Sequence, residues 1–486
     1  MCSRPARTSS RQPWARSATR TGASPSSSSI TAEAPGPADL RLTTGGTFFI
    51  QTLGCPKNEA DSDALEARLR AAGYRPAPAG RADVIVVNTC GFIDAAKEES
   101  IAAILDAAEA AHARGGRVAA VGCLVERYRD ELAAEVPEVD LWCGLDTAPL
   151  LAALAASGEG PKDAPPGATG GAARPHGGSV PVPRRPRPVS AYVKISDGCD
   201  RRCSFCAIPL IKGDYETVPA AEVLRVARAQ LTAGARELVL VGQDTSRWAQ
   251  PGWGGVSRLL AELAALEPAP AWLRLLYLQP DGVTGGLLEA LAAHAVPYVD
   301  IPLQHASGAV LRRMRRSGDG AAHLELLARV REALPGVAVR STFITGFPGE
   351  TDAESAELED FVREAGLAVA GVFVYDEQEG TAAAGMPDAV PHEVALGRAA
   401  RLGEVIDREA ARFWSALVGS EADILVEQGA ARAGGVAQGR IALQAPDVDG
   451  RATLTGVKAR RGQLVRAVVR DTLGYDVEVV AATGGP

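Results

Sequence analysis

Short apolar runs alternate with amphipathic segments from residue 47 to residue 155 and mark the first ordered region of the chain. Runs rich in β-branched residues predict strands at 47–54, 82–89, 117–122 and 139–144. The segments between them carry apolar residues at helical spacing and predict helices at 58–74, 94–113 and 125–136. Asn58 is the expected cap of the first helix. This alternation predicts a parallel sheet with helices packed on its faces.

The same alternation returns between residues 190 and 412. Strands are expected at 191–196, 237–242, 273–278, 298–303, 337–345 and 367–375. Repeated strand–helix units of this kind predict a TIM-like, partial β/α barrel. Residues 413–482 differ, because short β-like runs there are separated by Gly and Asp turns. That pattern predicts a small all-β barrel, so the fold class is α/β with an all-β C-terminal domain.

Two stretches have no hydrophobic periodicity. Residues 1–46 are rich in Ser, Arg, Thr and Pro, with Glu33 as the first acidic residue. Such a segment buries too little apolar surface to order itself, so we expect a disordered tail or a start codon called too early; a transit peptide is the alternative. Residues 156–189 are Gly- and Pro-rich and predict a linker between the domains at 47–155 and 190–412.

Net charge, apolar run length and cysteine clustering limit the classes of partner, location and chemistry that the chain can have. The 486 residues carry a net charge of −8, which favours a neutral small molecule or a basic partner over DNA. No apolar run reaches the ~18 residues needed to cross a membrane, and no signal peptide is evident, so we expect a cytoplasmic protein. Thiols clustered in a cytosolic chain indicate metal binding or catalysis rather than disulfides.

The stretch GCDRRCSFCAIP places Cys199, Cys203 and Cys206 together, and we call these three residues the loop trio. Structural zinc usually takes four protein ligands, and no histidine lies near this motif. Three thiolates leave one iron of a cubane cluster open to another ligand. The motif also follows a predicted strand, at the end where a barrel places its active site. A structural zinc site or three incidental thiols are the alternatives.

A second set of cysteines repeats with the period of the strands. Cys55, Cys90 and Cys123, the strand-end trio, each follow a predicted strand, at intervals of 35 and 33 residues. Successive parallel strands end at one edge of a sheet, where open α/β sheets bind ligands. We therefore predict a second cluster with an open position. Cys143 is interpreted as a core residue, and Cys2 is given no role.

The spacing CxxxCxxC, with Phe205 before the last cysteine, resembles the radical S-adenosylmethionine superfamily. Two such trios followed by a small β-barrel resemble the methylthiotransferase family, whose C-terminal barrel is called TRAM. The resemblance covers residues 47–482. GCPKN at Cys55, NTCGFIDAAKEES at Cys90, GQDTSRW at 242–248 and DIPLQHAS at 300–307 are similar to the RimO branch rather than to the tRNA-modifying MiaB branch.

The resemblance implies a sulfur-transferring enzyme with two 4Fe-4S clusters and S-adenosyl-L-methionine. The loop trio would hold the cluster that yields the adenosyl radical, which removes a hydrogen from the β-carbon of an aspartate in ribosomal protein uS12. The strand-end trio would hold an auxiliary cluster that carries the methylthio sulfur. Implied partners are uS12, an electron donor such as flavodoxin or ferredoxin, and a sulfur donor. The MiaB branch, which modifies an adenosine of tRNA, is the alternative.

The resemblance and the strand ends also suggest cofactor-binding residues. Phe205 is expected near the adenine, and Gln243, Asp244 and Gln304 follow strands at the barrel mouth. His305 is expected to be a hydrogen-bonded scaffold residue, and 346–351 (GFPGET) is either a cofactor-facing loop or a tight turn. One departure lies within 211–219, where Tyr215 to Thr217 replace an arginine–serine–arginine run that the family more often carries, leaving in doubt any anion contact made there.

The charge of the C-terminal barrel favours a protein substrate. Residues 413–482 contain eight acidic and eight basic residues, whereas a module that grips RNA is expected to be basic. An acidic enzyme would attract a basic ribosomal protein. Lys458, Arg460 and Arg461 form either a basic strip or, more simply, a solvated turn.

Overall fold

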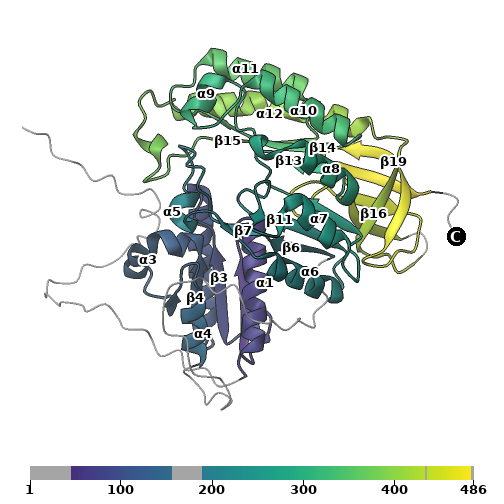
Figure 1. The fold of residues 1–486 in the computed structure, drawn as a ribbon. Helices are drawn as coiled ribbons and strands as arrows, with labels where there is room; N and C mark the ends of the chain where they lie inside the picture. The colour runs from purple at the N-terminus through teal and green to yellow at the C-terminus, as the bar shows by residue number, and fades with distance from the viewer. Residues whose placement is uncertain (1–44, 156–188, 433–434, 483–486) are drawn as a thin grey trace, which may run out of the picture. The chain divides into compact units, whose positions relative to one another are not determined.

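The computed structural model describes residues 45–155, 189–432 and 435–482 (Figure 1). Nearly all of the expected tail and linker lie outside these residues. The chain forms two compact units, and each is described separately: residues 1–58 with 68–172, and residues 59–67 with 173–486. The middle of the first long helix is thus grouped with the second unit.

A parallel five-stranded sheet organises the first unit, in the order β2-β1-β3-β4-β5. Its strands are β1 (Thr47–Thr52), β2 (Arg75–Pro76), β3 (Val84–Thr89), β4 (Arg117–Gly122) and β5 (Leu141–Trp142). The helical segments are α1 (Pro56–Ala71), η2 (Ala79–Arg81), α2 (Asp94–His112), α3 (Cys123–Glu135) and α4 (Ala148–Ala155). Strand β3 is buried along its whole length, because apolar residues of α2 and β4 pack around it. The predicted sheet is confirmed.

Asn58 does not cap α1 as the sequence suggested. The helix begins at Pro56, with Cys55 in the capping position, because the fixed φ of proline suits the first turn. Asn58 lies inside the helix, and its amide nitrogen donates to the carbonyl oxygens of Leu53, at 2.8 Å, and Thr89, at 3.1 Å. The side chain therefore ties the end of β1 to the end of β3.

Six parallel strands organise the second unit as a partial β/α barrel, as predicted. They form two sheets, in the orders β12-β9-β6 and β13-β14-β15. The strands are β6 (Ser190–Lys194), β9 (Glu237–Val241), β12 (Trp272–Leu275), β13 (Tyr298–Asp300), β14 (Ala338–Thr345) and β15 (Val369–Val374). The two sheets are connected beyond β12, where the Leu278 amide donates to the Asp300 carbonyl at 2.8 Å.

Helices and short hairpins link these strands (Figure 1). The helical segments are α5 (Ile208–Lys212), α6 (Ala220–Thr232), α7 (Val256–Ala264), η3 (Pro280–Gly282), α8 (Gly285–His294), α9 (Gly308–Arg313), α10 (Gly320–Ala333), α11 (Asp352–Ala365), η4 (Ala382–Gly385) and α12 (His392–Ser415). The hairpins pair β7 (Ser196–Asp197) with β8 (Glu216–Thr217) and β10 (Ala249–Gln250) with β11 (Gly254–Gly255). One large apolar core joins the barrel strands to α6, α7, α8, α10 and α11.

The C-terminal strands close into a small barrel in the order β16-β17-β18-β20-β19, drawn in yellow and yellow-green in Figure 1. They are β16 (Glu421–Gln428), β17 (Val436–Ile441), β18 (Ala452–Thr455), β19 (Leu464–Leu473) and β20 (Asp476–Ala481). The predicted all-β barrel is confirmed. Helix α12 runs three residues past the domain boundary expected at 412 and joins the small barrel to the larger one.

A buried ionic network joins the two barrels within the second unit. Glu237, at the start of β9, accepts hydrogen bonds from Arg274 at 2.9 Å and from Arg440 of β17 at 2.6 Å. All three side chains are almost fully buried. Because each charge is paired, the network avoids the large cost of an isolated buried ion. Among the described residues, no helix is both long enough and apolar enough to span a membrane.

Candidate functional site

The loop trio lies between β7 and α5, at the carboxyl end of the barrel strands. The loop is tied down through its backbone, since Cys199 N–H donates to the Gly213 carbonyl at 3.0 Å and Cys206 N–H to the Cys203 carbonyl at 3.1 Å. Gly198 begins the loop with φ +66°, and a Cβ there would lie 2.0 Å from the Asp214 carbonyl oxygen. Only glycine fits this position without moving the backbone.

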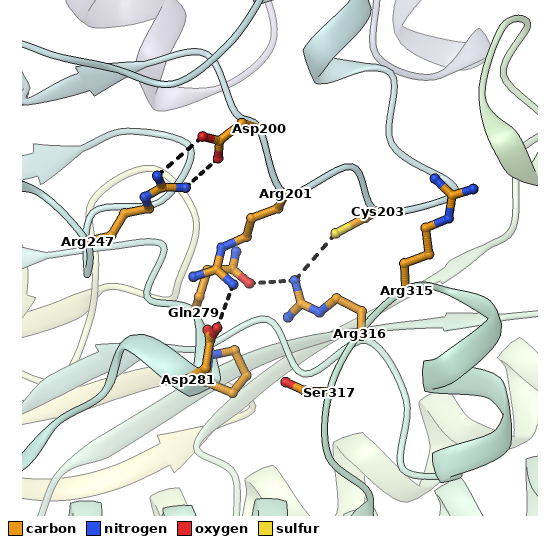
Figure 2. A pocket seen from close by; sticks show the side chains of 10 residues that line it. Asp200, Arg201, Cys203, Arg247, Gln279, Asp281, Arg315, Arg316 and Ser317 are labelled. Atoms are coloured by element: carbon orange, nitrogen blue, oxygen red, sulfur yellow. Dashed lines mark hydrogen bonds and ion pairs between the residues drawn. The ribbon is translucent and has the colours of Figure 1, made fainter.

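The thiols of the loop trio are partly buried, and burial favours the protonated form of Cys199 and Cys206 in the absence of a metal. Burial raises the pKa of Cys206 to about 12 and also raises the pKa of Cys199. The third thiol faces a cation, because Arg316 Nη1 lies 3.9 Å from Cys203 Sγ (Figure 2). A metal would supply the positive charge needed to hold all three sulfurs as thiolates.

A pocket of about 600 Å³ opens beside Cys203 (Figure 2). Its lining comprises Asp200, Arg201, Cys203, Arg247, Gln279, Pro280, Asp281, Arg315, Arg316 and Ser317. This volume lies within the range of ligand sites in proteins. The lining contains four arginines and only two carboxylates, so the pocket carries an excess of positive charge.

Two of the four arginines are neutralised by ion pairs. Arg201 donates from Nε to Asp244 at 2.6 Å and from Nη1 to Asp281 at 2.8 Å. Arg247 pairs with Asp200 and also lies over the ring of Tyr215, 4.4 Å from its centroid. Tyr215 belongs to the segment in which the family's arginine run is missing, and here it supports the Arg247 side chain.

The residues predicted to bind the cofactor have different environments. Phe205 packs against an apolar cluster that includes Val310, Met314 and Phe347. Asp244 is fully buried, and its carboxylate accepts a hydrogen bond from Arg201, which lines the pocket. Gln243 follows β9, and Gln304 adopts φ +71° after β13 and pairs with Phe343 of β14. Within the described part of the chain, Phe205, Gln243, Asp244 and Gln304 are not among the residues that line the pocket.

The strand-end trio lies at the carboxyl edge of the first unit's sheet. The register pairs Thr52 of β1 with Asn88 of β3, and Thr89 of β3 with Gly122 of β4. Cys90 and Cys123 therefore follow their strands at equivalent heights, and Cys55 follows the neighbouring strand one residue further on. Cys123 Sγ lies 4.0 Å from Asn58 Oδ1, which places the Asn58 side chain at the same edge.

Glycines let this edge close around the cysteines. A Cβ on Gly54 would lie 2.7 Å from Cys90 Cβ, and one on Gly91 would lie 2.7 Å from Leu124 Cα. Gly122 has φ +97°, and a Cβ there would lie 2.4 Å from Asn88 Oδ1. The close approach of the three strand ends thus depends on the absence of side chains. In the residues that the structure describes, no three His, Cys, Asp or Glu side chains are grouped around a point suited to a single metal ion.

Two residues and one turn that the sequence singled out have structural roles near the site or in the core. His305 is a buried scaffold residue, as expected, because its Nδ1 accepts from the Ser307 amide at 3.0 Å. Residues 346–351 form a tight turn in which the Glu350 carboxylate accepts from the Gly346 and Phe347 amides. Cys143 is fully buried, which confirms it as a core residue.

Sequence reasoning missed Arg316 and Asn58. Arg316 is 113 residues from Cys203 in the chain and reaches it only because the segment after α9 returns to the pocket. The basic run RRMRR at 312–316 was a visible signal, since clustered arginines near a barrel mouth indicate anion binding. Asn58 could also have been identified as a residue of the site, because it lies three residues after Cys55.

Known proteins match all three regions. Residues 47–144 match a family described as Uncharacterized protein family UPF0004, residues 193–362 the Radical SAM superfamily, and residues 418–481 the TRAM domain. Among solved structures, the radical S-adenosylmethionine methyltransferase TsrM from Kitasatospora setae, with cobalamin and a [4Fe-4S] cluster bound, is similar in fold, with TM-score 0.50 and 14% identity over 68% of this chain and 72% of that one. The match of residues 193–362 shows that the chain contains a radical S-adenosylmethionine domain.

Two relatives of known name identify the family within the radical S-adenosylmethionine class. A protein from Desulforudis audaxviator is 43% identical over 88% of this chain and 95% of its own length, and one from Sorangium cellulosum is 40% identical over 88% and 89%. Both are named ribosomal protein uS12 methylthiotransferase RimO. The chain belongs to this RimO family of methylthiotransferases.

Proposed function

We propose that this protein transfers a methylthio group to the β-carbon of an aspartate in ribosomal protein uS12. The observation that carries the proposal is the 43% identity to a RimO methylthiotransferase over nearly the whole of both chains. Two separate cysteine trios, each at the carboxyl end of parallel strands, fit a reaction that needs both a radical and a sulfur source. The identity to RimO proteins favours an aspartate of uS12 over a tRNA substrate.

The side chains at both trios fit 4Fe-4S clusters. Thiolates are the ligands that such clusters use, and three of them leave one iron open. The loop trio would hold one cluster and the strand-end trio the other. Bound there with S-adenosyl-L-methionine, the clusters supply the reductive radical chemistry and the site of the transferred sulfur. Glycines at positions 54, 91, 122 and 198 allow the backbone around the cysteines to pack closely, because a Cβ at each would overlap neighbouring protein atoms.

The chain's own residues bind and orient the reactants. Arg316 fixes the Cys203 side of the loop trio, and its Nη2 is held by the Pro302 carbonyl at 2.7 Å. Gln279 accepts a hydrogen bond from the same guanidinium, so the pocket wall is preorganised. Arg201, fixed between Asp244 and Asp281, ties the loop trio to the strand ends beyond β9 and β12.

The remaining partners follow from the chemistry. Reductive cleavage of S-adenosyl-L-methionine consumes an electron, so a donor such as flavodoxin or ferredoxin is needed, and each turnover consumes a sulfur atom that a sulfur donor must replace. The net charge of −8 favours encounter with a basic ribosomal protein. Because uS12 is made and assembled in the cytoplasm, we place the enzyme there.

Mass spectrometry tests the proposed substrate. The anaerobically reconstituted enzyme is incubated with reductant, S-adenosyl-L-methionine and either uS12, small ribosomal subunits or tRNA. We expect a methylthio adduct on one aspartate of uS12 and unmodified tRNA. A methylthio adenosine together with an unmodified aspartate would overturn the assignment in favour of the MiaB reaction. Absence of 5′-deoxyadenosine would exclude radical chemistry altogether.

A further inference from the structure

The four arginines of the pocket are not equivalent. Arg201 and Arg247 are bound to carboxylates, as described above. Arg316 is held by neutral partners, with Gln279 and the Pro302 carbonyl accepting its hydrogen bonds, while its remaining contact is the Cys203 sulfur. These three guanidinium groups are therefore fixed in place by the protein. Only Arg315 differs.

Among the described residues, the Arg315 guanidinium has no hydrogen-bond or ion-pair partner in the structure. The side chain is exposed at the pocket lining and extends away from Arg316 and Gln279 (Figure 2). In contrast, Arg313, two residues earlier, donates to the Pro348 carbonyl at 3.1 Å and to the Gly349 carbonyl at 3.0 Å. Arg313 is therefore held by hydrogen bonds within the protein, whereas the guanidinium of Arg315 is available to bind a ligand.

The backbone of Arg315 is also strained. It has φ +56°, in the left-handed region that residues other than Gly, Asn and Asp rarely adopt. Such strain persists only where the surrounding structure imposes it, and it is concentrated at functional sites. Here, the Arg315 N–H donates to the Arg312 carbonyl at 3.0 Å and the Arg316 N–H to the Leu311 carbonyl at 2.7 Å, which ends α9 tightly. The turn holds Arg315 at the pocket and sends Arg316 towards Cys203.

We propose that Arg315 binds the side-chain carboxylate of the target aspartate and so determines substrate specificity. The inference rests on the proposed function, because it identifies the group on uS12 that the pocket recognises. A guanidinium fork matches a carboxylate through two parallel hydrogen bonds. An amide or an aliphatic side chain at the target position would leave the charge of Arg315 unpaired once the substrate excludes water.

The position of Arg315 suits this role. The target β-carbon must come within reach of the radical formed at the loop trio, and Cys203 of that trio lines the same pocket as Arg315. A carboxylate held by Arg315 would fix the adjacent β-carbon through a single bond, leaving its hydrogens free to react. Recognition through two hydrogen bonds also restricts rotation of the side chain, which is how positioning increases the rate of a reaction.

A double-mutant cycle tests the pairing. Reconstituted holoenzyme is prepared as wild type, Arg315→Gln and Arg315→Lys, with Arg312→Gln as a matched control, because Arg312 is an exposed arginine of α9 outside the pocket lining. Each is titrated with the form of uS12 that the wild type modifies, free or in the small subunit, and with a variant whose target aspartate is asparagine. Affinity is measured by fluorescence anisotropy, and S-adenosyl-L-methionine binding by calorimetry.

We expect Arg315→Gln to weaken binding of the natural substrate roughly 10- to 100-fold, the range of a charge-assisted hydrogen bond. Arg315→Lys should lie between it and the wild type. The asparagine substrate should bind the wild type as weakly as Arg315→Gln binds the aspartate substrate, with no further loss when both changes are combined. Arg312→Gln should change nothing.

Three results would overturn the inference. Equal losses for aspartate and asparagine substrates in Arg315→Gln would mean that Arg315 does not contact the carboxylate. Weaker S-adenosyl-L-methionine binding with unchanged uS12 affinity would assign Arg315 to the cofactor instead. Unchanged affinity for both would leave it no binding role. If the wild type itself modifies neither form of uS12, the proposed function fails, and that result is obtained before any variant is compared.

Discussion

The two cysteine trios are positioned by different parts of the structure. The loop trio falls within eight residues of one loop, which hydrogen-bonds to itself and to Gly213 and the segment after α9. The strand-end trio spans 69 residues, and only the register of β1, β3 and β4 brings its members to one edge. One site is set by local backbone geometry, and the other by the fold of a whole domain. Changes that loosen a domain should therefore affect the two sites unequally.

Removing each trio separately should give the largest contrast. With Cys55, Cys90 and Cys123 all changed to alanine, we expect the reconstituted protein to keep about half its iron, since one of two four-iron sites remains. It should still form 5′-deoxyadenosine but transfer no sulfur. With the loop trio changed to alanine, cleavage should be lost while the other half of the iron stays. Iron and sulfide assays with chromatography of 5′-deoxyadenosine measure both; loss of cleavage in the first variant would contradict the separation.

A glycine substitution should break the strand-end trio without touching a cysteine. In Gly122→Ala, the new Cβ would meet Asn88 Oδ1 at 2.4 Å and the Thr89 carbonyl oxygen at 2.8 Å, at φ +97°. Strain and overlap together should cost roughly 3 kcal/mol and lower the iron bound by the first unit. Gly115→Ala is the matched control, because Gly115 has φ +72° but nothing within 4 Å of a Cβ. Equal iron content in the two variants would show that the close approach is unimportant.

Asn58→Ala should have a smaller effect at the same edge. The variant loses the hydrogen bonds to the Leu53 and Thr89 carbonyls, so the ends of β1 and β3 keep only their backbone pairing. Leaving buried carbonyls unpaired should cost about 2 kcal/mol. We expect a weaker auxiliary cluster, seen as faster iron loss to a chelator, and unchanged cleavage of S-adenosyl-L-methionine. A simultaneous decrease in cleavage would mean that the two sites are not independently held.

Acid should weaken the region around the loop trio. His323 of α10 is buried, and burial together with the nearby Arg316 lowers its pKa to about 4. The unfolded state, with a histidine pKa near 6.5, binds the proton more readily, so stability present at neutral pH is lost as pH falls from about 6.5 towards 4. Between pH 8 and pH 5 the loss should be about 2 kcal/mol.

Urea denaturation of the wild type and of His323→Leu at both pH values measures this contribution. The variant should lose about 2 kcal/mol less than the wild type between the two conditions, because it has no proton to bind. His392→Gln is the control, since His392 is exposed at the start of α12. An equal loss of stability between the two pH values in the wild type and in His323→Leu would contradict the prediction, because it would mean that the pKa of His323 is the same in the folded and unfolded states.

The sequence predicted most of the fold because its elements have clear periodicity. The parallel sheet, the six barrel strands and the closed C-terminal barrel all follow from apolar runs of the correct length. The sequence did not predict that α12 would continue to Ser415, since no Gly or Pro marks the expected boundary at 412. The β7–β8 hairpin was missed for a similar reason, because each of its strands has only two residues.

For the site, both trios were visible as spacings, yet the residues around them were not. Arg315 and Arg316 come from a turn more than a hundred residues beyond the cysteine motif, so only tertiary structure brings them near Cys203. Asn58 was read as a cap because Asn favours helix starts, but Pro56 starts the helix earlier and turns Asn58 inward. The ligand roles of the six cysteines stay a prediction, as do Phe205, Gln243, Asp244 and Gln304 as cofactor contacts.

The ion pair between Glu237 and Arg440 limits what can be learned about the C-terminal barrel by truncating the chain. In a truncated chain that ends after α12, Glu237 would lose Arg440, one of its two guanidinium partners. The apolar side chains that β16 and β17 cover would also become exposed to solvent. Such a fragment should be recovered mostly as aggregate, so its inactivity would say nothing about what the C-terminal barrel recognises. Point changes on the outer surface of that barrel, away from Arg440, are the informative route to its role.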